Sequence, residues 1–252
     1  MSPIDAVILV AAGVVAGIIG SGGGVTSLVS YPALLAVGVP PLPANIANLV
    51  AGIATGPGSA FSSRGELAES RTVLVRLLPA VFVGTAIGAG LLLVTPAPVF
   101  DRLVPFLVAV GSVVLIVQPA LLRLHARRAG RDALQLLLIG AVSIYGGYFG
   151  AGSGIMLLAV TLVMVDSRFP VANAIKNVLL GGISLVASAV FVATGPVLWA
   201  AVIPLAGGLL IGSALGPIIV RRLPPDLVRW VAASFGLVLA LYLWFRPGSR
   251  PA

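Results

Sequence analysis

Long stretches without a charged residue dominate the chain. Six runs contain no Asp, Glu, Lys, Arg or His, and they cover residues 6–63, 77–100, 103–122, 133–165, 177–220 and 230–245. A membrane-spanning helix needs about 20 consecutive apolar residues. The runs are continuous, whereas the strands of a membrane barrel would alternate in polarity over short segments. The pattern therefore predicts an all-α polytopic membrane protein.

Glycine and asparagine patterns in the first half recur in the same order in the second half. The glycines of "GIIGSGGG" recur 130 residues later in "GYFGAGSG", pairing Gly17, Gly20, Gly22 and Gly24 with Gly147, Gly150, Gly152 and Gly154. The segment "PLPANIANLVAG" pairs at an offset of 129 with "PVANAIKNVLLGG", which includes the pairs Pro41/Pro170, Asn48/Asn177 and Gly52/Gly181. Two later elements also match, with the pairs Gly84/Gly208, Gly88/Gly212, Pro98/Pro225 and Arg102/Arg229. This ordered series predicts two homologous halves.

Each half is expected to hold four membrane segments, about eight in all. The expected segments are 4–38, 44–62, 72–94 and 99–122 in the first half, and 132–166, 172–193, 198–220 and 227–245 in the second. The first segment of each half is expected to break at its glycine-rich turn. The predicted division is an N-terminal repeat at 1–125, a basic linker at 126–131 and a C-terminal repeat at 132–252.

The distribution of basic residues predicts the orientation of the halves. The cluster "RLHARRAGRD" at 123–132 should be cytoplasmic, because positively charged loops stay on that side. Parallel repeats would place "VRRLPPDLVR" outside, whereas inverted repeats, in which each broken segment turns back, place it inside. The charges therefore favour inverted repeats.

Composition removes several classes of function. Only 9% of the residues are charged and 59% are hydrophobic, against about 25% charged in a soluble domain. Cysteine is absent, which excludes disulfides and thiolate chemistry. The net charge of +8 comes from loop residues and reflects topology, so no nucleic-acid partner is expected. No carboxylate pair, Ser-His-Asp set or metal-ligand cluster stands out, so we expect no enzyme, no catalytic residue, no bound metal and no cofactor.

The glycine-rich stretches leave two interpretations open. They lack the Lys-Ser/Thr of a phosphate loop and the third glycine of a dinucleotide fingerprint. One interpretation is close helix packing through small residues, which predicts a continuous helix through Gly22–Gly24. The other is a pair of half-helices, 5–19 and 25–38, of about 15 residues or 22 Å each, too short to cross a core of about 30 Å. In transporters, the N-termini of such half-helices face anionic substrates.

On the second interpretation, the two breaks form a cage for an anion. The expected substrate-binding residues at the breaks are Ser21, Gly22, Gly23, Gly24 and Thr26 in the first half and Gly152, Ser153 and Gly154 in the second. Four asparagines near the starts of apolar helices are either caps or further ligands: Asn45, Asn48, Asn173 and Asn177. Lys176, the only lysine, either snorkels to the interface or faces the interior, where ionisable groups mark a substrate pathway.

The chain resembles the TauE/SafE family of sulfite exporters. The resemblance rests on "AGIIGSGGGVTSLVSYPALLAVGVPP" with "ANIANLVAGIATGPGSAFSSRGEL", and on "GGYFGAGSGIMLLAV" with "ANAIKNVLLGGISLVASAVF" and "RRLPPDLVRW". It implies a multi-pass carrier of the cell inner membrane for sulfite, sulfonates or sulfoacetate-like anions.

The leading hypothesis is thus a secondary transporter with alternating access around a mid-membrane site, in which Lys176 supplies charge. A passive anion channel and a non-transport membrane protein, either an assembly factor or an intramembrane enzyme, remain as alternatives. The expected partners are a small anionic substrate and the lipid bilayer. A homodimer and a coupling ion, either proton or sodium, stay open.

Overall fold

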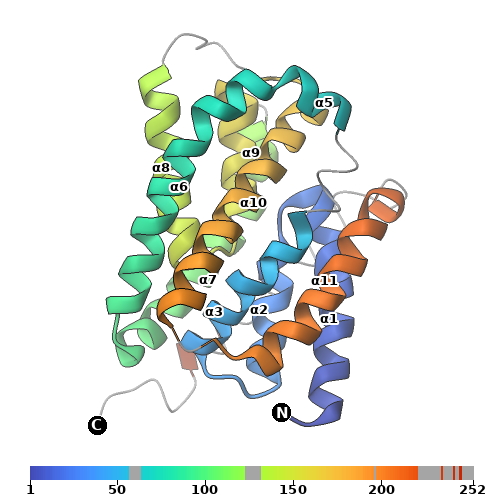
Figure 1. Ribbon diagram of the computed structural model, residues 1–252, viewed down its shortest axis with the longest axis vertical. Helices are drawn as coiled ribbons and strands as arrows, with labels where there is room; N and C mark the ends of the chain where they lie inside the picture. Colours follow the sequence, from blue (N-terminus) through green and yellow to red (C-terminus); the bar gives the residue numbers. More distant parts are fainter. Residues whose placement is uncertain are drawn as a thin grey trace.

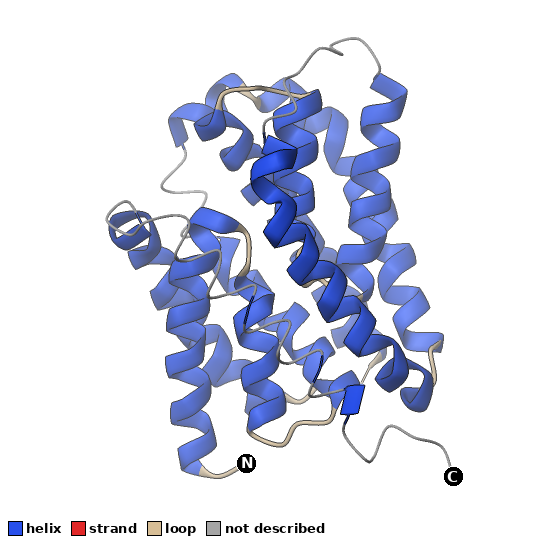
Figure 2. Cartoon of the chain, turned by 180° about the vertical axis from the view of Figure 1, so that it is seen from behind, coloured by secondary structure: helices blue, strands red, loops and turns tan. Residues whose placement is uncertain are grey.

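The structure is a computed structural model, and it describes residues 1–56, 64–122, 132–195 and 197–220 together with residues 234, 241, 244 and 245. Throughout these residues the regular structure is helical, and no strand occurs (Figure 2). The predicted linker 126–131 and nearly all of the predicted segment 227–245 lie outside the described residues.

The described residues of the first half form six helices and one 3-10 turn. They are α1 (Pro3–Gly23), α2 (Thr26–Ala36), α3 (Pro41–Ala51), η1 (Gly52–Ala54), α5 (Arg64–Glu69), α6 (Arg71–Val94) and α7 (Ala97–Leu122). A capping box opens α1, because the Ser2 hydroxyl accepts from the Asp5 N–H at 3.2 Å and Asp5 Oδ2 accepts from the Ser2 N–H at 2.6 Å. The second predicted helix begins earlier than expected, at Pro41, because proline suits the first helical position.

Four described helices make up the second half: α8 (Asp132–Tyr148), α9 (Ser153–Met164), α10 (Phe169–Thr194) and α11 (Trp199–Val220). Five described helices are long and apolar enough to cross a membrane, namely α1, α6, α7, α10 and α11. The prediction of a polytopic helical protein is therefore confirmed.

The expected length of the first half-helix was wrong. Helix α1 continues past residue 19 to Gly23 and has 21 residues, which is long enough to cross the hydrocarbon core. Its glycines are tolerated because they let a second helix approach closely. The helix then ends, since Gly24 adopts a left-handed conformation with φ 71°, and α2 begins at Thr26.

The first helix of each half packs against the third helix of the other half. On α1, Gly13 lies beside Gly208 of α11 and Gly17 lies beside Gly212, because a Cβ at either position would come within 3.0 Å of the facing glycine's backbone. On α6, the backbone at Gly84 and Gly88 lies in the same way against α8. Gly88 and Gly212 are repeat partners, so the two contacts are equivalent.

These glycine contacts predict a specific loss of stability. A Cβ added at Gly212 would overlap the carbonyl oxygen of Val14, whereas one at Gly207 meets nothing within 4 Å. We therefore expect Gly212→Ala to lower the free energy of unfolding by about 1–3 kcal/mol through overpacking. Gly207→Ala should leave it unchanged or raise it, because alanine favours the helix. Thermal unfolding of the two variants in detergent checks this, and equal stabilities would contradict the packing.

Contacts along the helices fix their relative directions. The pairs Gly13/Gly208 and Gly17/Gly212 rise together in number, so α1 and α11 run the same way. Helix α3 with η1 runs against α10, since the Ser188 hydroxyl lies 3.5 Å from the Val50 carbonyl oxygen while Gly52 faces Ser184. In Figure 1, α1 starts at the lower end of the molecule, whereas α6, α8 and α10 start at the upper end.

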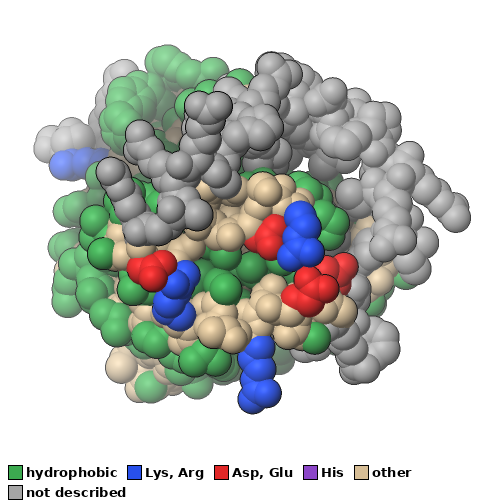
Figure 3. Space-filling model, turned by 90° about the horizontal axis from the view of Figure 1, so that it is seen from above, with side chains coloured by type: hydrophobic (Ala, Val, Ile, Leu, Met, Phe, Trp, Pro, Cys, Tyr) green, Lys and Arg blue, Asp and Glu red, His purple; other side chains and the backbone are tan. Residues whose placement is uncertain are grey.

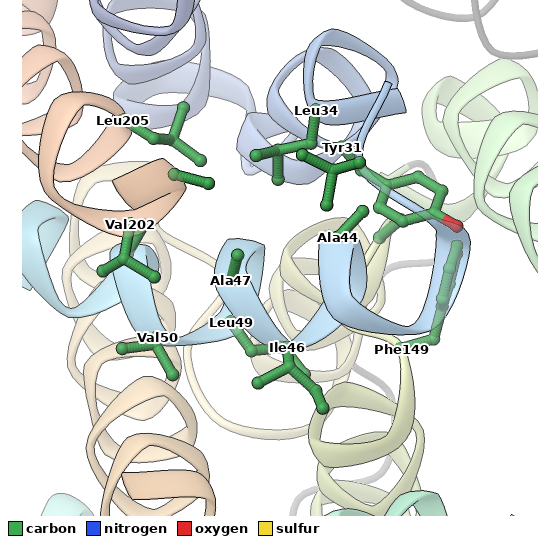
Figure 4. Close-up of a cluster of buried hydrophobic side chains, with 14 of the residues drawn as sticks. Tyr31, Leu34, Ala44, Ile46, Ala47, Leu49, Val50, Phe149, Val202 and Leu205 are labelled. Carbon is green, nitrogen blue, oxygen red and sulfur yellow. The ribbon is translucent and has the colours of Figure 1, made fainter. Parts of the chain in front are cut away.

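Helix α3 lies at the centre of the bundle. Every residue from Ala44 to Ala51 is buried, so this helix is covered on all sides. Figure 4 shows α2 and α11 on one side of α3, with Ala44 and Ala47 pointing towards that side and Ile46 and Leu49 pointing to the other. Tyr31 of α2 packs edge-on against Phe149, with ring centroids 5.2 Å apart. The core thus ties α3 to the break between α8 and α9.

Exposed charges mark the end of the bundle at which α6, α8 and α10 begin. Arg76 pairs with Asp132 at 2.7 Å, and Arg168 pairs with Asp166 at 2.9 Å and with Glu69 at 3.3 Å. The hydrogen bonds from Arg168 hold the pKa of the Asp166 carboxyl below its usual range. Figure 3, seen from this end, shows acidic and basic side chains around an apolar centre. This end of the bundle therefore faces water.

Candidate functional site

The two glycine-rich turns, far apart in sequence, touch each other in the fold. A Cβ added to Gly154 would lie 2.5 Å from the carbonyl oxygen of Gly24 and 2.9 Å from its Cα. Gly24 is left-handed with φ 71° before α2, and Gly152 is left-handed with φ 85° before α9. Only residues without a Cβ allow both the backbone conformation and this approach. The N-terminal ends of α2 and α9 are therefore held together.

A small cavity of about 50 Å³ lies at this junction. By the space that a water molecule needs, it holds about three or four water-sized groups. It is lined by Gly24, Thr26, Ser27, Asn48, Leu49, Gly52, Thr55, Gly146, Gly150, Ser153, Gly154, Leu180, Ile183 and Ser184. None of these residues is charged, so the cavity is neutral, and it combines polar side chains with an apolar wall.

A second cavity of about 20 Å³ adjoins the first. The two share Thr26, Thr55 and Leu180, and the second is also lined by Gly17, Gly20, Asn177 and Ser213. It therefore extends the polar space towards the contact between α1 and α11.

The cavity lies at the middle of the length of helix α10. Helix α10 has 26 residues, which corresponds to about 39 Å at 1.5 Å per residue. The lining residues Leu180, Ile183 and Ser184 fall at the centre of this helix. A helix of this length is long enough to span a hydrocarbon core of about 30 Å.

Asn48 presents a free hydrogen-bond donor at this cavity. Its side chain is only 3% exposed, and its Oδ1 lies 2.5 Å from the Ser30 hydroxyl, which is also 3.0 Å from the Thr26 carbonyl oxygen. The Ser30 hydroxyl fixes the orientation of the amide, whose Nδ2 has no hydrogen-bond partner in the described part of the chain. A buried donor left unpaired costs about 1–3 kcal/mol. Such a donor is suited to a ligand that accepts hydrogen bonds.

The N-termini of α2 and α9 contribute further donors. Thr26 and Ser27 open α2, Ser153 and Gly154 open α9, and all four line the cavity. No side chain caps either terminus. The first N–H groups of a helix lack partners within the helix, although the Ser153 N–H donates to the Gly150 carbonyl oxygen at 3.1 Å, before the start of α9. The dipole of a helix also favours a negative charge at its N-terminus. Two such ends at one cavity favour an anion.

Several of the other residues predicted from the sequence occupy different positions in the helices from those expected. Ser21, Gly22 and Gly23 form the last turn of α1 and do not belong to the N-terminus of α2. The asparagines lie inside α3 and α10, whose N-caps are Pro40 and Arg168, so none of them is a cap. Gly152 is instead the residue that caps α9.

Three predicted side chains lie outside the main cavity. Asn45 Nδ2 donates to the Tyr148 carbonyl oxygen at 2.8 Å and thereby holds the end of α8. Asn177 lines the adjoining cavity. Asn173 lines neither cavity, and its Oδ1 is buried without a hydrogen-bond partner among the described residues.

Lys176 is fully buried and lines neither cavity. Its Nζ has no hydrogen-bond partner in the described ranges. The side chain shares a face of α10 with Leu180 and Ile183, which lie four and seven residues further on and line the main cavity. Lys176 therefore lies on the cavity-facing side of α10, about one helical turn nearer the charged end of the bundle.

Sequence reasoning missed several lining residues, above all Thr55 and Ser184. A signal for this pair existed, because they are separated by 129 residues, as are Asn48 and Asn177. Both are hydroxyl residues that follow the asparagine of the motif, Asn48 or Asn177, by seven residues, or about two helical turns. Reading the repeat for chemical type as well as identity would have included them.

Comparisons with known proteins agree with this architecture. The family described as "Sulfite exporter TauE/SafE" matches residues 6–243. The chain is 27% identical over 250 residues to a "Probable membrane transporter protein" of Haemophilus influenzae, covering 96% of this chain and 95% of that protein. It is 25% identical over 244 residues to "Probable membrane transporter protein ORF9" of Sinorhizobium sp., covering 95% and 92% of the two chains.

A third relative is "Probable membrane transporter protein YfcA" of Escherichia coli strain K12, 26% identical over 258 residues and covering 97% of this chain and 91% of that protein. No solved structure is a significant match. The family match over nearly the whole chain and the five candidate membrane spans establish a multi-pass membrane protein of a transporter family. The chain belongs to the TauE/SafE sulfite exporter family.

Proposed function

We propose that this protein is a secondary transporter of small sulfur-containing or organic anions, of the sulfite, sulfonate or sulfoacetate type. The observation that carries the proposal is the neutral cavity at mid-length of α10, where the N-termini of α2 and α9 meet beside the free amide of Asn48. A small oxyanion accepts several hydrogen bonds at once, and backbone N–H groups at helix ends bind such groups without a full counter-charge.

In this proposal each part of the site has one task. The N-terminal backbone of α2 and α9, around Thr26, Ser153 and Gly154, binds the anion. The amide of Asn48 orients it, and Asn177 lines the space into which it moves. Lys176 contributes positive charge from the same face of α10.

The two halves are inverted repeats in this proposal, with about eight membrane segments in all. Two observations support it. Helix α3 runs against its repeat partner α10, and α1 starts at the opposite end of the molecule from its repeat partner α8 (Figure 1). The breaks after α1 and α8 then turn back within the membrane. Inverted repeats around a central site permit alternating access by movement of one repeat against the other.

The proposed orientation places the charged end of the bundle in the cytoplasm. Helices α6, α8 and α10 begin there, and the residues that precede α8 in the sequence, 123–131, are rich in arginine. The positive-inside rule assigns such a segment to the cytoplasmic side.

Counterflow in proteoliposomes tests the function. Vesicles loaded with unlabelled methanesulfonate or sulfite are diluted into a trace of the labelled anion. A carrier exchanges the two, so the labelled anion should accumulate transiently above its external concentration and then decline. Flux that only equilibrates the label would indicate a channel. Absence of any flux above that of empty vesicles would contradict transport of these anions.

A further inference from the structure

Lys176 places an ionisable amine in the protein interior, and the proposed anion site by itself does not explain why it is there. Its side chain is 0% exposed, and its Nζ has no hydrogen-bond partner among the described residues. An ammonium group in such surroundings is strongly disfavoured unless a counter-charge is nearby. Either the amine stays neutral or a negative charge must arrive.

No ionisable side chain in the described ranges supplies that counter-charge. The helices packed against α10 carry ionisable residues on α5, α6 and α8, namely Arg64, Glu66, Glu69, Arg71, Arg76, Asp132, Tyr145 and Tyr148. Arg76 is paired with Asp132, and Glu69 is paired with Arg168. The described parts of α3, η1 and α9 carry no ionisable side chain. Among the residues that the structure describes, no negative charge is therefore paired with the Lys176 amine, and a bound anion would supply one.

The cavity is the place from which such a charge reaches Lys176. Leu180 and Ile183 line it and follow Lys176 on the same face of α10. Asn177, the next residue along the chain, lines the adjoining cavity. The lining residues themselves are all uncharged, so an anion bound there would bring a charge that no described lining residue supplies.

We propose that Lys176 is the coupling site of the carrier, and that it takes up one proton when an anion occupies the cavity. The inference rests on the proposed function. In the empty protein the amine is neutral. The bound anion stabilises the ammonium form, the added proton comes from solution, and no covalent bond other than N–H is made. Anion and proton therefore bind cooperatively, and a univalent anion crosses with no net charge added to the protein.

Calorimetry on the purified full-length protein in detergent tests this. The probe is sodium methanesulfonate, because a sulfonate stays ionised and takes up no proton itself. Titrations in two buffers of different ionisation enthalpy count the protons bound per anion. The wild type should approach one proton per anion at alkaline pH, and its affinity there should fall by about tenfold for each unit of rising pH.

Two variants separate titration from structure. Lys176→Arg keeps a charge that does not titrate in this range, so it should bind methanesulfonate with no proton uptake and with an affinity independent of pH. If that variant does not fold, Lys176→Gln supplies the test, since it should bind more weakly than the wild type and also without proton uptake.

The outcomes distinguish the two proposals. Binding by the wild type without proton uptake, or unchanged uptake in either variant, overturns the coupling role of Lys176 and leaves the anion site intact. Absence of methanesulfonate binding to the wild type contradicts the sulfonate specificity of the proposed function and removes this inference with it.

Discussion

Asn48→Leu is expected to weaken anion binding strongly, and to slow transport at low anion concentration to the same degree, while the protein remains folded. Leucine has nearly the same shape as asparagine, but it removes the buried Nδ2 donor that lacks a partner at the cavity. A hydrogen bond to a charged group contributes about 1.5–3 kcal/mol, so anion affinity should fall roughly tenfold to a hundredfold. The Ser30 hydroxyl keeps the Thr26 carbonyl oxygen as its acceptor at 3.0 Å. The cost to folding should therefore be small.

Thr85→Val is the matched control for this experiment. Thr85 is 0% exposed, its Oγ1 has no hydrogen-bond partner among the described residues, and it lies outside both cavities. Valine has the same shape as threonine, so this change also deletes one buried polar atom that is unpaired. Binding should stay as in the wild type. Calorimetry with methanesulfonate and thermal unfolding separate affinity from stability. Equal affinities for the Asn48 and Thr85 variants would remove Asn48 from the site.

Gly154→Ala is expected to disrupt the site by separating the two breaks. The new Cβ would lie 2.5 Å from the Gly24 carbonyl oxygen, which is backbone and cannot rotate away. Overpacking of this kind costs about 1–3 kcal/mol of stability. The N-termini of α2 and α9 would also move apart, which weakens anion binding. We expect anion affinity to fall by at least about tenfold, which corresponds to a loss of about 1.4 kcal/mol in binding free energy.

Gly181→Ala provides the comparison on a neighbouring helix. A Cβ at Gly181 meets nothing within 4 Å, although the adjacent Leu180 lines the cavity. Alanine also favours a helix over glycine by about 1 kcal/mol. The variant should bind and transport as the wild type does, with equal or higher thermal stability. Wild-type transport by Gly154→Ala would show that contact between the breaks is not needed for function.

The sequence predicted the long helices because their signal is local. Uninterrupted apolar runs bounded by charges located α6, α7, α10 and α11 to within three residues at each end. The sequence predicted the length of α1 less accurately, because the glycines of α1 weaken a helix taken in isolation. In the fold, Gly13 and Gly17 are covered by α11, a contact with the other half that local propensity cannot report.

For the site, the sequence identified which types of residue are present but not which of them line the cavity. Asn45 and Asn48 are equivalent by pattern, yet one holds the Tyr148 carbonyl oxygen and the other keeps a free donor at the cavity. A three-residue difference on a helix turns two side chains by about 60° from each other. Which of them faces the cavity depends on the helices packed around α3.

The sequence by itself determined a helical membrane protein with a repeated glycine-and-asparagine pattern, because apolar length and residue order are properties of the chain. The tertiary structure decided that Gly24 touches Gly154, that Asn48 keeps an unpaired amide at the cavity, and that Lys176 is buried about one turn away. These facts depend on contacts between residues more than 100 positions apart. Close packing and the burial of single polar atoms fix such contacts only when the whole bundle has assembled.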